Sequence, residues 1–359
     1  MRILYFACLE LGSESGVLKK INRQVEYWEK EGNEVFVFYI SSQKNTNSLS
    51  KRAVVVEPKS IFSKFSDVYV FKFLFRVYAT IKLLPRLKAI SPDIIYVRQV
   101  LWFPFIGQVL KFRPSIVEVN NNDIVELQNK GAFIRGILSG FRKLFFMNVD
   151  GVVSVTNELE GSYPKGILFK ALTNSYPVPS KLRNKVRRSN QILFMSSPNQ
   201  PWQGVDKIIL LARHFSTYEF SVVGWDDSGF LDVPSNVQFK GYLTGDELHK
   251  QIINADYAIG PLALHRKNMH STSAIKIGEY LSNNLPVILA YEETSVSGDM
   301  LCVLDNDENN INKFNLNKVA LFLSYWKDKN IDRNIVFQQL SPEVIETQRL
   351  DFFKAILCK

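Results

Sequence analysis

The chain has 359 residues, of which 46% are apolar and 22% charged, so its composition excludes a disordered chain and suits about two folded domains. A formal net charge of +9 favours phosphorylated ligands, anionic lipid or nucleic acid without choosing among them. The three cysteines are odd in number and far apart, which argues against a disulfide framework. Because the N-terminal apolar run is also too short for a secretory signal, we expect a cytoplasmic protein.

The first half of the chain opens with a predicted strand at residues 3–8, a glycine-containing loop, a helix at 17–30 and a strand at 35–40. This order predicts a βαβ unit and therefore a parallel sheet. Later apolar runs, each followed by polar residues, predict further strands at 94–97, 116–119 and 151–155. We expect an open doubly wound sheet with its ligand-binding loops at the carboxyl ends of the strands. The candidate residues in or beside these loops are Gly16, Lys19, Arg98 and Asn120.

Two segments of the first half combine aromatic, aliphatic and basic residues. Residues 61–90 carry Lys72, Arg76, Lys82 and Arg86 on about a third of a helical wheel. Residues 131–147 place a second basic group, Arg135, Arg142 and Lys143, on one side of a helix. Charges recur too often for a transmembrane span. Two interpretations stay open: peripheral contact with an anionic membrane, or helices packed on the sheet with a solvated basic stripe.

A basic, proline-containing linker at residues 176–190 separates the two halves, after which the strand and helix pattern begins again. The predicted strands of the second half are residues 192–195, 220–223, 237–240, 257–259 and 287–291. Its predicted helices are residues 205–214, 245–254 and 274–281, and a last helix covers 342–359. The sequence thus predicts an N-terminal domain at 1–175, a second domain at 191–340 and a C-terminal helical segment at 341–359.

The helix at 274–281 follows a hydroxyl-rich cluster, residues 271–273, which is a helix-start signal. The N-terminus of a helix offers free N–H groups and suits a phosphate. Lys276 and Glu279 are three residues apart and share one face of this helix. That face can offer a cation to a diphosphate and a carboxylate to sugar hydroxyls. The alternative is an ordinary surface ion pair between the same two residues.

The run from Ser273 to Ile288, S-A-I-K-I-G-E-Y-L followed by P-V-I, resembles the nucleotide-binding helix of GT-B glycosyltransferases, close to family 4. Four further runs stand before it in family order: W-x-G-V-D-K, S-V-V-G, N-V-x-F-x-G-Y and A-D-Y-A-I-G-P. The resemblance covers nearly all of residues 192–291 and extends more weakly over 1–175. It implies two Rossmann-like domains that face a cleft, with a C-terminal helix that crosses back to the first domain.

The resemblance also implies roles for individual residues. Glu279 would bind the ribose hydroxyls of the donor, and the backbone at Gly241 and Tyr242 would meet the nucleobase. Many family members have an Arg and a Lys in the loop after the first strand of the second domain, but here Gln203 stands in place of the Lys and there is no Arg. We therefore expect Lys276, the helix start at Ser273 and Arg266 to bind the diphosphate.

The remaining expectations concern catalysis and the acceptor. Gly16, Lys19, Arg98 and Asn120 would face the acceptor or the cleft, whereas Glu118 and His265 are the candidate catalytic bases. No spacing of Cys or His suggests a metal site, so we expect neither metal nor cofactor, and no nucleic-acid partner.

The sequence therefore predicts a hexosyltransferase that uses a UDP- or GDP-sugar and a carbohydrate acceptor, polyprenyl-linked, in bacterial surface polysaccharide assembly. Two alternatives stay open: an inactive nucleotide-binding partner of another transferase, and a nucleotide-sugar 2-epimerase.

Overall fold

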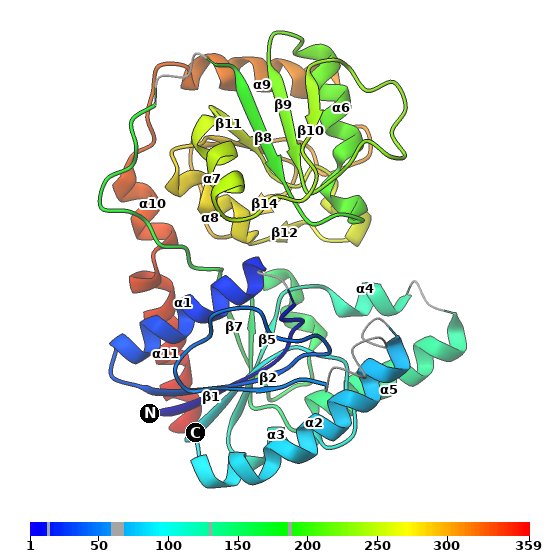
Figure 1. Cartoon of the computed structure of the whole chain (residues 1–359), viewed down its shortest axis with the longest axis vertical. Coiled ribbons are helices and arrows are strands. Elements are labelled where there is room, and N and C mark those ends of the chain that lie inside the picture. The colour runs from blue at the N-terminus through cyan, green and yellow to red at the C-terminus, as the bar shows by residue number, and fades with distance from the viewer. Residues whose placement is uncertain (13–14, 59–67, 129–130, 186–188) are drawn as a thin grey trace. The chain divides into compact units, whose positions relative to one another are not determined.

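The computed structural model describes residues 1–12, 15–58, 68–128, 131–185 and 189–359, with side chains at 126–128 excepted (Figure 1). The start of the basic aromatic segment at 61–67 and residues 186–188 of the linker lie outside the described residues. The chain divides into two compact units. The first is Met1–Leu172 with Ile345–Lys359, and the second is Thr173–Val344.

The first unit contains a seven-stranded sheet in which every neighbouring pair of strands is parallel. Its order is β3-β2-β1-β4-β5-β6-β7, so the direction of winding reverses between β1 and β4. The strands are β1 (Arg2–Cys8), β2 (Glu34–Ile40), β3 (Ala53–Val56), β4 (Ile94–Arg98), β5 (Ser115–Val119), β6 (Gly151–Ser154) and β7 (Leu168–Ala171).

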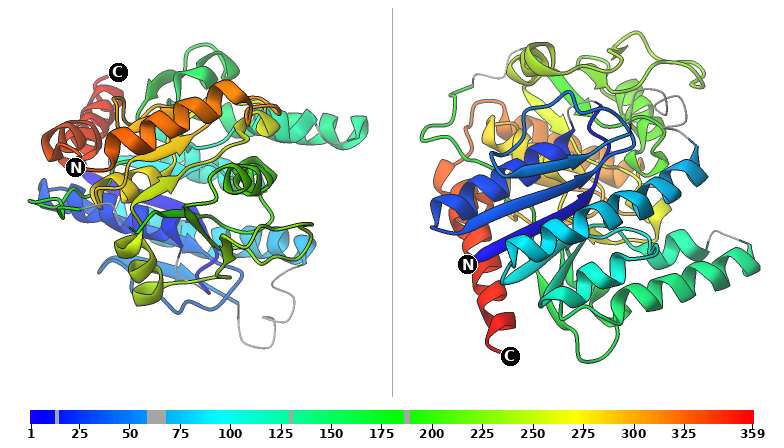
Figure 2. Two further views of the ribbon diagram at one scale, coloured as in Figure 1. Left: turned by 90° about the horizontal axis from the view of Figure 1, so that it is seen from above. Right: turned by 60° about the horizontal axis from the view of Figure 1, so that its bottom comes forward.

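Helices cover both faces of this sheet because successive strand residues are buried on opposite sides. One face packs against α2 (Tyr69–Ile90), α3 (Ile106–Phe112) and α5 (Ala132–Phe146), of which α2 is light blue and α5 teal in Figure 2. The other face packs against α1 (Gly16–Lys30) and α11 (Pro342–Leu357), which lie side by side in Figure 1. The short helix α4 (Asp123–Gln128) follows β5.

Helix α11 joins the first unit through a buried polar network as well as through apolar packing. The Glu346 carboxylate accepts a hydrogen bond from Trp28 Nε1 at 3.1 Å and pairs with Arg349 at 2.9 Å. Arg349 in turn donates to the Tyr96 hydroxyl at 2.8 Å, and Phe353 packs edge-on to Trp28. The charges of Glu346 and Arg349 are thus compensated inside the first unit.

The second unit repeats the pattern with a six-stranded parallel sheet of order β10-β9-β8-β11-β13-β15. Its strands are β8 (Gln191–Met195), β9 (Glu219–Val223), β10 (Val237–Phe239), β11 (Tyr257–Ile259), β13 (Val287–Leu289) and β15 (Leu301–Val303). A separate parallel pair joins β12 (Ser271–Thr272) to β14 (Glu292–Glu293). The helices are α6 (Val205–His214), α7 (Gly245–Asn254), α8 (Ile275–Ser282), α9 (Lys313–Trp326) and α10 (Arg333–Leu340).

The prediction of a doubly wound parallel sheet in each half is confirmed. Two strands at the edges of the first sheet, β3 and β7, were not predicted, because each has only four residues and is paired on one side. Helices α9 and α10 were not predicted either. Among the described residues, no helix is long and apolar enough to cross a membrane.

Candidate functional site

The candidate site lies at the carboxyl ends of β8 and β11, where the winding of the second sheet reverses. Two loops meet there. The carbonyl of Gln203, after β8, accepts the Leu262 N–H at 3.1 Å, and the carbonyl of Trp202 accepts the Ala263 N–H at 3.2 Å. Gly204 has φ +73°, and a Cβ on it would lie 2.9 Å from the Leu262 Cβ. Glycine therefore allows the two loops to approach each other.

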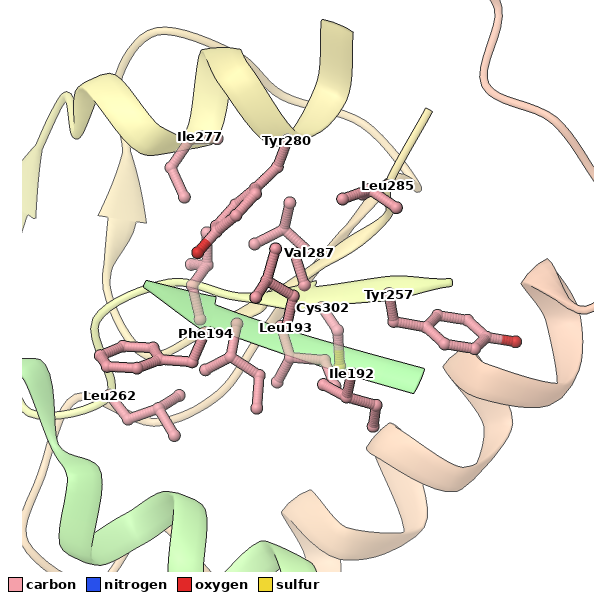
Figure 3. Packing of buried hydrophobic residues seen from close by; sticks show 14 of the residues in the cluster. Ile192, Leu193, Phe194, Tyr257, Leu262, Ile277, Tyr280, Leu285, Val287 and Cys302 are labelled. Atoms are coloured by element: carbon pink, nitrogen blue, oxygen red, sulfur yellow. The ribbon is translucent and has the colours of Figure 1, made fainter. Parts of the chain in front are cut away.

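Helix α8 is anchored on the sheet by its buried face. Ile277 and Tyr280 point from the helix toward β8 and β13 (Figure 3). The Tyr280 hydroxyl oxygen accepts the Met195 N–H at the end of β8 at 2.9 Å. Gly278 lies against Tyr176, where a Cβ would come within 2.6 Å of the Tyr176 Cβ. These contacts fix the position from which Lys276 and Glu279 extend.

Lys276 turns toward the loop after β8. Its Nζ donates a hydrogen bond to the Gln203 Oε1 at 2.6 Å and lies 4.6 Å from the centre of the Phe194 ring. Burial lowers the pKa of the Lys276 ammonium to about 7, because none of the neighbours given by the structure is a carboxylate that would hold the charge. Lys276, which is predicted to bind the diphosphate, therefore loses its proton more easily than an ordinary lysine, and an anion bound beside it would favour the protonated form.

The Glu279 carboxylate forms no hydrogen bond or ion pair with any residue that the structure describes, although its backbone carbonyl accepts from Asn283 Nδ2. The surface ion pair between Lys276 and Glu279, the alternative interpretation of their spacing, does not form. Glu279 is half-buried, so part of its hydration is already lost. A half-buried carboxylate with open acceptor positions suits a ligand that donates two hydroxyl groups.

The helix start at Ser273 is occupied by protein groups. The Ser273 Oγ accepts the Asn174 N–H at 3.0 Å, and its carbonyl accepts Asn174 Nδ2 at 2.6 Å. The next N–H, of Ala274, donates to the carboxylate of the buried Glu293 at 3.2 Å. Burial raises the pKa of Glu293, and hydrogen bonds from Ser295 and Tyr291 oppose that shift. These contacts favour a structural role for Ser273 over direct phosphate binding.

Arg266 and His265 lie on a 3-10 turn, η4 (Leu264–Lys267), within a charge cluster. The Arg266 guanidinium forms a two-pronged ion pair with Asp206 at 2.9 and 2.7 Å and a second pair with Glu308 at 2.5 Å. His265 Nε2 lies 2.8 Å from the Glu308 carboxylate, which Lys207 also contacts. The hydrogen bond from Arg266, followed by those from Lys207 and His265, lowers the pKa of Glu308. These contacts favour a structural role for the cluster, and they leave the predicted roles of Arg266 and His265 without support.

Gln203, Gly241 and Tyr242 border the same edge of the sheet. Gln203 is buried, and its amide bridges Gln200 and Lys276. The Gly241 carbonyl accepts the Gly224 N–H at 2.7 Å, and the Gly241 N–H donates to the Trp225 carbonyl at 3.1 Å. Gly241 also lines a cavity of about 270 Å³ beside Phe239, and the Tyr242 side chain is 63% exposed. An exposed ring next to a backbone turn is a surface on which a planar base can stack.

In the first unit, Glu118 is buried and paired with Lys20, and it accepts from the Tyr5 hydroxyl at 2.8 Å. Burial alone would raise the pKa of Glu118, but Lys20 and then Arg98 lower it to about 2. Such a weakly basic, enclosed carboxylate is poorly suited to accept an acceptor proton at neutral pH. Asn120 lies 3.4 Å from the Lys20 ammonium.

Lys20 is not among the predicted site residues, although its position in α1 carries a signal. Lys20, Gln24 and Trp28 recur every four residues within the apolar stripe of α1, and all three are buried. Gly16, by contrast, is the exposed first residue of α1, and Lys19 lines a separate cavity of about 430 Å³ with Asn22.

Two doubly wound parallel-sheet units, the second with a helix that carries Lys276 and Glu279 beside the switch point, define the GT-B glycosyltransferase fold, as predicted. Sucrose-phosphate synthase from Thermosynechococcus elongatus superposes with a TM-score of 0.70 at 14% identity, covering 99% of both chains. HepE of Anabaena, in complex with UDP, gives a TM-score of 0.64 at 11% identity over 99% of this chain and 100% of that chain. An alpha-glucosyltransferase in complex with UDP gives 0.62 at 12% identity over 100% of both. No protein-family model and no curated protein matches the sequence.

Proposed function

We propose that the protein is a glycosyltransferase that takes a sugar from a UDP- or GDP-sugar donor and transfers it to a carbohydrate acceptor. One observation carries this proposal: α8 presents both Glu279, whose carboxylate has no partner among the described residues, and Lys276, whose ammonium donates to the neutral amide of Gln203 instead of to that carboxylate. The GT-B fold, with UDP-bound proteins among the similar structures, supports it.

In this proposal Lys276 and Glu279 bind different parts of the donor. Departure of a nucleoside diphosphate builds negative charge on the diphosphate oxygens, which a positioned cation stabilises. Lys276 meets this need as a point charge, and an approaching diphosphate raises its pKa and so keeps it protonated. Glu279 accepts hydrogen bonds from the ribose hydroxyls and holds the donor in register. The transfer proposed is of a hexose and needs no metal ion.

The acceptor is proposed to be lipid-linked, which places the protein at the inner face of the cytoplasmic membrane and in bacterial surface polysaccharide assembly. Helices α2 and α5 contain no acidic residue, and they expose large apolar side chains beside basic ones. The most exposed apolar side chains of these two helices are Tyr69, Val70 and Leu74 on α2 and Phe133 on α5, and the exposed Met147 follows α5 directly. A basic surface with exposed aromatic and aliphatic groups suits an anionic lipid interface.

A thermal-shift panel with UDP, GDP, ADP, CMP and their sugar conjugates tests the proposal. A ligand that binds only the native state raises the unfolding midpoint by mass action. We expect a rise with one uridine or guanosine nucleotide that is lost in Glu279→Ala but kept in Glu247→Ala, which removes an exposed carboxylate from α7. A folded wild-type protein with no shift for any nucleotide would contradict the proposal.

One observation favours a second candidate, a nucleotide-binding partner of another transferase. Gln203 stands where many family members carry a lysine, and Arg266 is held by Asp206 and Glu308. Both features reduce the positive charge available to a leaving diphosphate. Release of free sugar from a bound donor in the absence of acceptor would decide for the enzyme, whereas nucleotide binding with no hydrolysis or transfer would decide for the partner.

A further inference from the structure

Two cavities of the first unit lie on two faces of helix α5. The first, of about 360 Å³, is bordered on one side by large apolar side chains that include Tyr69, Trp102 and Leu138, and elsewhere by the polar residues Gln99, Asn121, Asp123 and Arg142. The second, of about 420 Å³, is bordered by Arg135, Ser139, Arg142, Lys143 and Ser162. Arg142 and Phe146 border both cavities, so the two cavities adjoin each other along α5.

Hydrogen bonds and ring contacts hold the shared wall, and the charge of Arg142 in it is balanced. The Arg142 Nε donates to the Asp123 carboxylate at 2.8 Å, and its Nη2 donates to the Ser162 carbonyl at 2.8 Å. The guanidinium also lies over the Phe146 and Tyr163 rings, 5.0 and 5.4 Å from their centres. Since Asp123 compensates the charge of Arg142, this residue shapes the wall and does not supply the net charge of the basic cavity.

The net positive charge of the basic cavity comes from Arg135 and Lys143. They are eight residues apart on α5, on the face that also carries Ser139. Both are exposed, and the side chain of neither pairs with a carboxylate among the residues that the structure describes. Two cations that have no carboxylate partner in the described part of the chain, beside two hydroxyl-bearing residues, match a phosphate, whose oxygens accept hydrogen bonds and carry negative charge.

We propose that these two adjoining cavities form one binding site for a long-chain lipid phosphate: the phosphate binds at Arg135 and Lys143, and the start of the hydrocarbon chain lies against Leu138 and Trp102 on the apolar side of the first cavity. This inference rests on the proposed transfer to a lipid-linked acceptor and assigns the lipid end of that acceptor to α5. A purely electrostatic membrane contact would need only the basic cavity, and an apolar ligand would need only the other.

Binding of the full-length protein to phosphatidylcholine vesicles that contain a polyprenyl phosphate tests the site, with phosphatidylglycerol vesicles of the same surface charge as the reference. We expect tighter binding to the polyprenyl phosphate vesicles, by about tenfold or more. Arg135→Glu with Lys143→Glu should abolish that preference. The matched control, Arg86→Glu with Lys88→Glu on α2, removes the same charge and should keep the preference, even if it weakens binding to both kinds of vesicle.

Two further measurements keep the outcomes separate. Leu138→Asn, which leaves every charge in place, should lower the preference, and soluble geranyl phosphate should displace the protein at far lower concentration than inorganic phosphate. Equal binding to both vesicle types, no binding to either, or equal competition by inorganic phosphate would overturn the inference. Because no nucleotide is present, these results are independent of the thermal-shift panel: nucleotide binding with no lipid preference refutes only this site, and lipid preference with no nucleotide binding refutes only the proposed transferase.

Discussion

The Lys276 ammonium lies 2.6 Å from the Gln203 side-chain oxygen and forms no ion pair with Glu279, one turn further along the same helix. An amide accepts a hydrogen bond but supplies no compensating charge. The loop after β8 therefore keeps a lysine side chain directed at the strand ends while leaving both charged groups of α8 available for a ligand. The consequences for pH dependence, donor affinity and stability differ from those of a surface ion pair.

Donor binding should depend on pH through Lys276. Its pKa in the free protein is about 7, below the ordinary value for lysine, because of burial. A diphosphate binds the protonated form, so affinity for the nucleotide should be highest below about pH 7 and fall by up to about tenfold per pH unit above it. Titration calorimetry with UDP or GDP between about pH 6 and about pH 9 measures this slope.

The matched variant for this pH dependence is Lys276→Arg. Arginine stays protonated throughout that range, so the variant should bind with a nearly flat pH profile. Lys276→Met should bind weakly at every pH. A wild-type affinity that does not change with pH, or a Lys276→Met variant that keeps wild-type affinity, would show that Lys276 does not contact the diphosphate.

Folding stability should show the opposite trend for the same residue. In the unfolded chain a lysine titrates near its ordinary pKa of about 10.4, whereas in the native protein Lys276 loses its proton near pH 7. Between these values the unfolded state binds more protons, so the contribution of Lys276 to the free energy of unfolding rises with pH from about 7 to about 10. Urea titrations of wild type and Lys276→Met across this range should diverge, and parallel curves would contradict the assignment.

Glu279 should matter for affinity and hardly at all for stability. It has no protein partner among the described residues, so Glu279→Gln leaves no buried group unpaired. Loss of charge-assisted hydrogen bonds to two hydroxyls should weaken nucleotide binding by about 1.5–3 kcal/mol. The 2′-deoxynucleotide separates this role from a general effect: it should bind wild type more weakly than the ribonucleotide does but show little difference in Glu279→Gln. Equal loss of affinity for both nucleotides in the variant would contradict ribose recognition.

The buried pair of Lys20 and Glu118 should control the stability of the first unit. Glu118→Gln keeps an acceptor for the Tyr5 hydroxyl but leaves the Lys20 charge uncompensated, which should cost about 3–5 kcal/mol. The double variant Lys20→Met with Glu118→Gln should recover most of this loss, as denaturant unfolding can measure. Since the pKa of Glu118 is lowered to about 2, its stabilising contribution is present above its ordinary pKa and is lost as pH falls from about 4 to about 2. A Glu118→Gln variant that is fully stable but catalytically dead would instead support the catalytic base.

Local sequence patterns predicted most of the fold, because strands buried on both faces are short continuous apolar runs and amphipathic helices repeat their apolar residues every three to four positions. Helix α8 is observed one residue from its predicted bounds, since its stop signal at Asn283 is local. Contacts between side chains that are far apart in the sequence produce no such local pattern. Lys20 contacts Glu118, which is 98 residues away in the sequence, and Arg266 contacts Asp206, which is 60 residues away. Sequence analysis therefore found the charged residues at the strand ends but could not tell which of them other charges already compensate.

Arg266 provides the last test, because its predicted role and its observed contacts point to different results. If Arg266 binds the diphosphate, its substitution should lower the affinity for nucleotide. If Arg266 instead holds η4 against α6 and Glu308, its substitution should lower the stability of the protein. Arg266→Lys keeps the charge but cannot form the two-pronged pair with Asp206, so it should lower the unfolding midpoint. Its nucleotide affinity should change by less than about threefold, or about 0.7 kcal/mol, well below the effect of Lys276→Met. If affinity falls as far as in Lys276→Met while the unfolding midpoint stays unchanged, Arg266 leaves its carboxylate partners to bind the donor.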